Sequence, residues 1–209
     1  MATLSRPSSC LLMLCLGLFL FVDLAASRLT GAQEFPAATP VDTHTIGLTA
    51  GPFFPIRMLP NQSSKLFGEA LMPSWMMTLT GPVGSGWYQG RLAVGAEVIA
   101  FHTTEPLTAY GVGFTPKLAY TSTAFGQMRP FLEAGGGPVW TDLGGRVPEQ
   151  PGQFNFLVWG GAGCAYQMTH DWAFTAGYRV MHISNAETRA PNSGLNFGLP
   201  FIGLSYQRF

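Results

Sequence analysis

Charged side chains are scarce in this chain. Asp, Glu, Lys and Arg make up 11% of its residues, whereas soluble domains average about a quarter. The 11 basic and 11 acidic side chains give a formal net charge of zero. A balanced chain offers no basic surface to a nucleic acid, so no nucleic-acid partner is expected. The hydrophobic share is 47%, so the chain combines many apolar side chains with few charges that could cover a water-exposed surface.

Cysteine is nearly absent as well. Cys10 and Cys15 lie in an N-terminal signal-like segment, which leaves Cys164 as the remaining thiol. A lone cysteine cannot form an internal disulfide, so we interpret Cys164 as a small apolar residue. Because no cysteine lies at the expected cleavage region, a lipoprotein is not expected.

Long hydrophobic runs are absent too, and the longest one has the context of a secretory signal. Arg6 precedes an apolar run at residues 11–22, and Ala25-Ala26-Ser27 supplies the small residues of a cleavage site. The run is too short for a comfortable transmembrane helix. We therefore expect a signal peptide at residues 1–32, with the cleavage position left open, and a Pro/Ala/Thr linker at residues 33–43.

The remainder of the chain divides into eight segments with the alternation of β-strands. Gly, Pro, Asn and Ser cluster between the segments, as turns require. No segment has a sustained helical period with caps, and the 26 glycines of the chain also disfavour helix. The expected strands are residues 44–51, 74–80, 88–101, 109–121, 130–140, 154–166, 172–184 and 195–209.

One face of these segments is apolar, and the other carries small residues with a few isolated charges. Successive side chains of a strand point to opposite faces. The isolated charges are Arg91, Glu97, Lys117, Glu133 and Arg179. They are too few to solvate an exterior, so we place the apolar faces outside and pair the charges in a narrow lumen. A soluble ligand-binding barrel would instead require the apolar faces to turn inward.

The pattern predicts an all-β fold, an eight-stranded antiparallel up-and-down transmembrane β-barrel at residues 44–209. An even number of strands returns both ends of the barrel to the periplasmic side. The expected periplasmic turns are residues 81–87, 122–129 and 167–171, and the expected outer links are residues 52–73, 102–108, 141–153 and 185–194. Side chains fill the interior of a barrel this narrow, so a pore is not expected.

The segment at residues 172–184 ends in a histidine and a serine on its apolar face. His182 and Ser184 are two residues apart, which separates their Cα atoms by about 6.6 Å and lets a ring nitrogen reach the serine oxygen. A base beside a hydroxyl is the first requirement of a nucleophilic serine. The spacing alone also fits a half-exposed strand end with two polar residues.

The residues around this pair favour the nucleophilic serine over a strand end that happens to carry two polar residues. The motif H-x-S-N-A at residues 182–186, followed by P-N-x-G at residues 191–194, resembles the signature of the PagL-like lipid A 3-O-deacylases, an outer-membrane acyloxyacyl hydrolase family. Upstream, P-F-L-E-A-G at residues 130–135 is similar to a strand of the same family. The resemblance covers residues 110–209.

The resemblance implies a role for each polar residue of the motif. Ser184 would be the nucleophile and His182 its general base. Asn185 would donate to the oxyanion of the attacked ester, and Asn192 matches a second polar position that a plain turn residue also explains. The topology places the pair at the outer end of a strand on the lipid-facing side, at the headgroup level of the outer leaflet of a Gram-negative outer membrane.

The chain departs from the family at the acid of the triad. The family usually has a glutamate fourteen residues after the histidine, where this chain has Asn196. Asn196 shares the face of the pair, and its amide oxygen can orient the ring but cannot balance an imidazolium charge. Glu187 is an alternative acid, although a solvated loop carboxylate explains it equally well.

The sequence therefore predicts an outer-membrane serine esterase that removes the 3-O-linked hydroxyacyl chain of lipid A and so remodels lipopolysaccharide. The alternative, favoured by Asn196, is a non-catalytic eight-stranded outer-membrane barrel with a decayed hydrolase site. No cofactor or metal is expected, because the chain lacks G-x-S-x-G, Walker, H-E-x-x-H and paired C-x-x-C motifs and its other histidines are scattered. The expected partners are lipid A and the outer membrane, while a homodimer and the acyl-chain specificity are left open.

Overall fold

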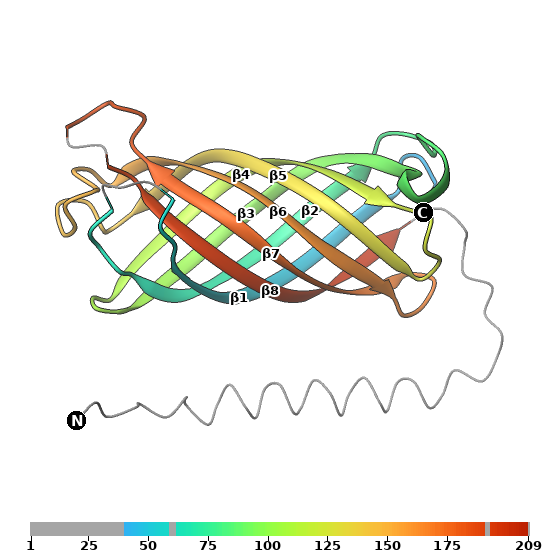
Figure 1. The fold of residues 1–209 in the computed structure, drawn as a ribbon, viewed down its shortest axis with the longest axis horizontal. Helices are drawn as coiled ribbons and strands as arrows, with labels where there is room; N and C mark the ends of the chain where they lie inside the picture. The colour runs from blue at the N-terminus through green and yellow to red at the C-terminus, as the bar shows by residue number, and fades with distance from the viewer. Residues whose placement is uncertain (1–39, 59–61, 191–192, 209) are drawn as a thin grey trace, which may run out of the picture. The chain divides into compact units, whose positions relative to one another are not determined.

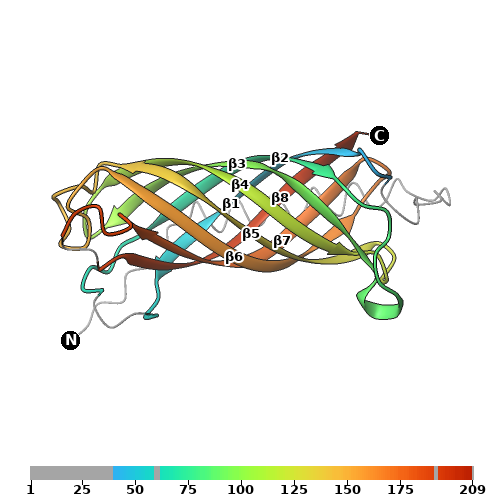
Figure 2. The same cartoon turned by 90° about the horizontal axis from the view of Figure 1, so that it is seen from above.

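The computed structural model describes residues 40–58, 62–190 and 193–208, so the predicted signal peptide and residues 33–39 of the predicted linker lie outside the described residues. Each strand pairs antiparallel with the next, and the first pairs with the last, which closes the barrel (Figures 1 and 2). The predicted eight-stranded antiparallel up-and-down barrel is confirmed. Its strands are β1 His44–Pro55, β2 Phe67–Thr78, β3 Gly90–Glu105, β4 Ala109–Ser122, β5 Met128–Thr141, β6 Phe154–Gln167, β7 Trp172–Ser184 and β8 Leu195–Arg208.

The connections gather at the two ends of the barrel. We call one end the loop end, with residues 56–66, 106–108, 142–153 and 185–194, and the other the turn end, with residues 79–89, 123–127 and 168–171. The loop end lies on the left in Figure 1. Across the described part of the chain, no helix has the length and apolar content needed to cross a bilayer.

The clearest error in the predicted boundaries concerns β2, which begins at Phe67 and not at Ser74. The expected strand began directly after Pro73, and a proline has no N–H to give to a strand ladder. The register with β3 passes from Leu71 opposite Ala100 to Ser74 opposite Glu97. The strand therefore continues through the proline, and the predicted link at residues 52–73 shortens to residues 56–66.

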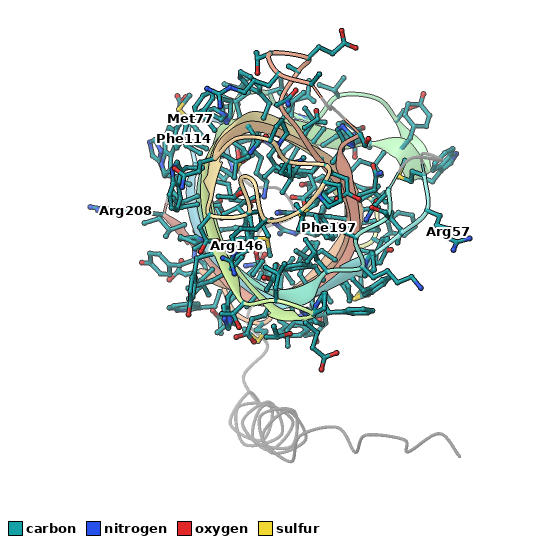
Figure 3. The ribbon with its side chains drawn as sticks, turned by 90° about the vertical axis from the view of Figure 1, so that its left-hand side faces the viewer. Arg57, Met77, Phe114, Arg146, Phe197 and Arg208 are labelled. Carbon is teal, nitrogen blue, oxygen red and sulfur yellow. The ribbon has the colours of Figure 1, made fainter. Side chains whose placement is uncertain are left out.

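The outer wall of the barrel is apolar, as predicted. Ile46 and Leu132 each expose 62% of their surface. Figure 3 looks along the barrel and shows Phe114 and Met77 outside the ring of strands, with Phe197 inside it. A soluble ligand-binding barrel would turn its apolar faces inward, so the exposed apolar wall does not fit that alternative.

Exposed aromatic side chains mark both ends of this apolar wall. Near the loop end they are Tyr110, Trp140 and Phe154, and near the turn end they are Tyr166, Trp172 and Tyr206. Two aromatic girdles around an apolar band are typical of barrels that span an outer membrane, where amphipathic rings favour the interface.

Four of the five isolated charges meet inside the barrel, as predicted, whereas the fifth, Arg91, donates to the backbone carbonyl of Thr80 at 3.3 Å. Arg179 donates to both carboxylate oxygens of Glu97 at 2.6 and 2.9 Å and to Glu133 at 2.6 Å. Lys117 lies 3.2 Å from Glu97 and 2.8 Å from Glu133. The two acids and two bases form a neutral quartet, and their pairing offsets the desolvation cost of burying the four charges.

The inner face differs from the expectation of small residues and charges at the loop end of the lumen. There the lumen is filled by an apolar core that includes Phe53, Ile99, Leu157, Met181 and Phe197. Leu143 and Val147, from the loop at residues 142–153, belong to the same buried cluster. Near its end, strand β7 thus buries Met181 and Ile183 of its inner face in this core, which gives the end of the strand that carries His182 and Ser184 a packed support.

Candidate active site

His182 and Ser184 lie at the end of strand β7, on its outer face. The inner-facing neighbours Met181 and Ile183 are buried in the apolar core, whereas His182 and Ser184 are half-buried. In the ladder, His182 lies opposite Asn196 of β8. The predicted shared face of His182, Ser184 and Asn196 is therefore present at the loop end.

Asn196 holds the imidazole of His182. Nδ1 of His182 lies 2.9 Å from Oδ1 of Asn196. An amide oxygen can only accept, so this hydrogen bond requires the proton of the neutral ring on Nδ1. The other ring nitrogen, Nε2, then carries the lone pair that a general base needs.

The Ser184 hydroxyl is close in sequence but is not yet bonded to the ring. Among the described residues, no hydrogen bond joins Ser184 to His182. Catalytic hydrogen bonds often tighten only when the substrate is bound, and rotation about the serine side chain is enough to redirect the hydroxyl. The two residues therefore form a dyad by position, with His182 already oriented.

The other predicted site residues, Asn185, Glu187 and Asn192, belong to the loop that follows β7. Asn185 is buried, and its side-chain amide donates to the backbone carbonyl of Arg189 at 2.8 Å, so this side chain holds the loop. Glu187 is exposed, has a φ of 62°, and makes no hydrogen bond or ion pair with His182 in the described part of the chain. Asn192 lies outside the described residues. The roles proposed for Asn185, Asn192 and Glu187 stay predictions.

Sequence reasoning missed Gln62, which comes from the loop at residues 56–66. Its Oε1 accepts from the backbone N–H of Asn196 at 2.8 Å and from Nδ2 of Asn196 at 3.2 Å. Ile56 of the same loop also donates to the carbonyl of Asn196 at 3.1 Å. These contacts explain why Asn196 is only 1% exposed although it points away from the lumen.

The loop that carries Gln62 is fastened to the loop at residues 142–153 by a buried carboxylate. Glu149 accepts from the backbone N–H groups of Ser63 and Ser64 at 2.6 and 2.8 Å and from their hydroxyls at 2.9 and 2.6 Å. Burial alone would raise the pKa of Glu149. The hydrogen bonds from Ser64 and Ser63 lower this pKa by more than burial raises it, so the pKa of Glu149 lies below its usual value. We call this contact the Glu149 latch.

The Glu149 latch should open in acid. A carboxyl whose pKa is lowered by folding stabilises the closed loop fully above its usual pKa, and this contribution disappears as the pH falls through the lowered value. We expect the amide proton shifts of Ser63 and Ser64, followed by NMR in detergent micelles, to titrate together below the ordinary 4.5 of a glutamate. In Glu149→Gln this shared acid step should vanish. A step that persists in the variant would assign the titration to another group.

Gly194, the glycine of the P-N-x-G motif, packs directly against the imidazole ring of His182. It has a φ of 67°, and a Cβ built there would lie 3.0 Å from Nε2 of His182 and would overlap Cε1. Only a glycine combines this backbone conformation with such a close approach. The motif had signalled this residue, but the sequence alone did not give its partner.

We expect Gly194→Ala to lower any deacylase activity by about 10- to 100-fold, because a displacement of a reacting group by about 1 Å can cost that much. The matched control is Gly126→Ala at the turn end, where φ is also positive at 62° and a Cβ meets nothing within 4 Å. Both variants carry the same type of backbone strain. Equal activity of the two variants would show that the contact with His182 is irrelevant.

No group of three or more His, Cys, Asp or Glu side chains in the described part of the chain could hold a metal ion. The side chains of the site offer three groups for chemistry. They provide an oriented imidazole, a hydroxyl on the same face, and a buried amide that fixes the ring.

These features define an eight-stranded β-barrel with the apolar wall and aromatic girdles of an outer-membrane protein and a histidine–serine pair on its outer face. The chain belongs to the PagL family of lipid A 3-O-deacylases, because a model of that family matches residues 68–205. The matched region contains His182, Ser184 and Asn196, whereas Gln62 lies before it. No curated protein matches the chain.

Two solved structures are similar in fold. The outer-membrane enzyme PagL is 22% identical, with a TM-score of 0.54 over 76% of this chain and 97% of its own. Neisserial surface protein A (NspA) is 13% identical, with a TM-score of 0.50 over 78% of this chain and 96% of its own. At these identities the likeness supports the barrel alone.

Proposed function

We propose that this protein is a serine esterase of the outer membrane that removes the 3-O-linked hydroxyacyl chain of lipid A. The observation that carries the proposal is the 2.9 Å contact between Nδ1 of His182 and Oδ1 of Asn196, beside Ser184 on the membrane-facing surface. Membership of the lipid A 3-O-deacylase family supports the substrate class. No cofactor is required for ester hydrolysis by such a pair.

In this proposal the ester is cleaved in two steps. The Oγ of Ser184 attacks the ester carbonyl carbon and gives its proton to Nε2 of His182. The bond between the acyl carbon and the sugar oxygen then breaks, and the sugar oxygen takes the proton from His182. A water molecule hydrolyses the acyl-enzyme by the same route and releases a hydroxy fatty acid. Asn185 is the proposed donor to the oxyanion.

The surroundings of the pair support a substrate that lies in the membrane. Ser184 is opposite Phe156, and His182 is opposite Val158, in the neighbouring strand β6. Both neighbours are exposed and apolar, at 38% and 53%. We infer that the pair lies at the headgroup level of the outer leaflet, where an apolar wall can receive an acyl chain next to polar chemistry.

The direct test is the lipid A mass spectrum of a Gram-negative host that lacks such an enzyme, with and without this protein. Expression should give a species that has lost one hydroxyacyl chain, and tandem fragmentation should assign the loss to a 3-O position. An unchanged spectrum, with folded protein present in the outer membrane, would contradict the proposal.

The second candidate is a barrel that keeps the family scaffold without activity. Asn196 favours it, because an amide lacks the charge that stabilises an imidazolium. Folded protein that leaves lipid A unchanged, and that stays inactive when Asn196→Glu restores the carboxylate, would support this second candidate.

A further inference from the structure

An asparagine in the acid position has a specific weakness, because its side chain has two unlike ends. If Oδ1 of Asn196 faces His182, the ring proton is on Nδ1 and Nε2 can accept the serine proton. If Nδ2 faces the ring, Nδ1 must accept and the proton moves to Nε2. In the serine proteases, the corresponding change from aspartate to asparagine produces this wrong tautomer and lowers kcat by about 10⁴-fold.

In this protein the orientation of Asn196 is determined by Gln62. Nε2 of Gln62 donates to two backbone carbonyls, those of Ser64 at 3.2 Å and Asn196 at 3.4 Å. Its Oε1 accepts from the backbone N–H of Asn196 at 2.8 Å. Because backbone groups cannot exchange their donor and acceptor roles, Gln62 can present only its oxygen to Nδ2 of Asn196, 3.2 Å away.

Two further observations prevent the alternative orientation. The Glu149 latch fixes Ser63 and Ser64, the residues that follow Gln62, through four hydrogen bonds of 2.6 to 2.9 Å. Asn196 is 1% exposed. A turned amide would therefore place its oxygen against Oε1 of Gln62 with little water to compensate, which is costly for a buried polar atom.

We propose that Gln62 is a positioning residue that fixes the amide of Asn196 with Oδ1 toward His182, and so sets the tautomer in which Nε2 of His182 is the base. The inference rests on the proposed function for its catalytic meaning, although the tautomer itself can be measured without it. Gln62 lies outside the family-matched region, at residues 68–205. The glutamine–asparagine pair thus replaces a carboxylate, which has two accepting oxygens and needs no such orientation.

The test uses ¹⁵N-histidine-labelled full-length protein in detergent micelles, at a pH where His182 is neutral. The ¹⁵N shifts should place the ring proton on Nδ1 in the native protein and partly on Nε2 in Gln62→Met. In Asn196→Asp/Gln62→Met, the proton should return to Nδ1, because a carboxylate accepts from either oxygen. Gln127→Met, the same change at the turn end, is the matched control and should leave the His182 shifts unchanged.

Deacylation rates in the same variants separate orientation from a general loss of structure. Gln62→Met should slow the Asn196 protein by about 10-fold or more, up to the about 10⁴-fold of a wrong tautomer, but it should not slow the Asn196→Asp protein. An equal loss in both backgrounds, or a native tautomer in Gln62→Met, would overturn the inference. If no variant deacylates lipid A, the proposed function fails, and the ¹⁵N shifts still decide the role of Gln62.

Discussion

Ser184→Ala should abolish measurable deacylation of lipid A while the barrel keeps its stability. Loss of the nucleophile from a hydrolase that works through an acyl-enzyme typically lowers kcat by about 10³-fold or more. The structural cost should be small, because within the described residues the Ser184 hydroxyl makes no hydrogen bond that the change would break. The measurement is the fraction of lipid A that has lost its 3-O-linked chain, compared at equal amounts of folded barrel.

The matched control is Ser205→Ala in β8, which removes a hydroxyl near the turn end and should leave deacylation unchanged. The folded barrel can be quantified from its altered gel migration before and after boiling. Wild-type rates in Ser184→Ala would remove Ser184 as the nucleophile. A loss of folded barrel would show that the hydroxyl has a structural role that the contacts do not indicate.

The barrel could be predicted because its signal is local. Side chains that alternate between lipid and lumen leave a period of two in the sequence, and this period identified all eight strands. The prediction from this period fails in detail near the end of β7, where the inward-facing Met181 and Ile183 lie in an apolar core and not among small residues and charges. It also fails at Pro73, which the strand tolerates although prolines usually interrupt a ladder.

Only the site residues that lie on strands could be predicted from the sequence, because spacing and pairing along a strand determine which side chains share a face. His182 and Ser184 share a face by their spacing, and Asn196 joins them because it lies opposite His182 in β8. Gln62 carried no comparable signal, since it contacts Asn196 from a loop 134 residues earlier. Such a contact depends on how the loop at residues 56–66 folds over the wall, and neither periodicity nor a motif encodes that path.

The largest expected effect on stability comes from Arg179→Met in the lumen. Arg179 is 1% exposed and contacts both acids of the quartet, Glu97 and Glu133. Its removal leaves two buried carboxylates with Lys117 as the remaining base of the quartet. Breaking a buried ionic cluster in this way costs about 3–5 kcal/mol. The free energy of unfolding can be measured by urea titration of the protein in lipid bilayers.

The double variant Arg179→Met/Glu97→Gln shows whether charge imbalance causes the loss. It removes one acid with one base and keeps the 2.8 Å pair of Lys117 and Glu133. The remaining pair of the quartet is then neutral again, so the double variant should be more stable than the sum of its single variants by about 0.5–3 kcal/mol. Arg57→Met, an exposed arginine outside the wall in Figure 3, should change stability by no more than about 0.5 kcal/mol. Strictly additive losses would mean that Arg179 stabilises the lumen mainly by packing over Trp159, 4.0 Å from its ring centre, and not by charge.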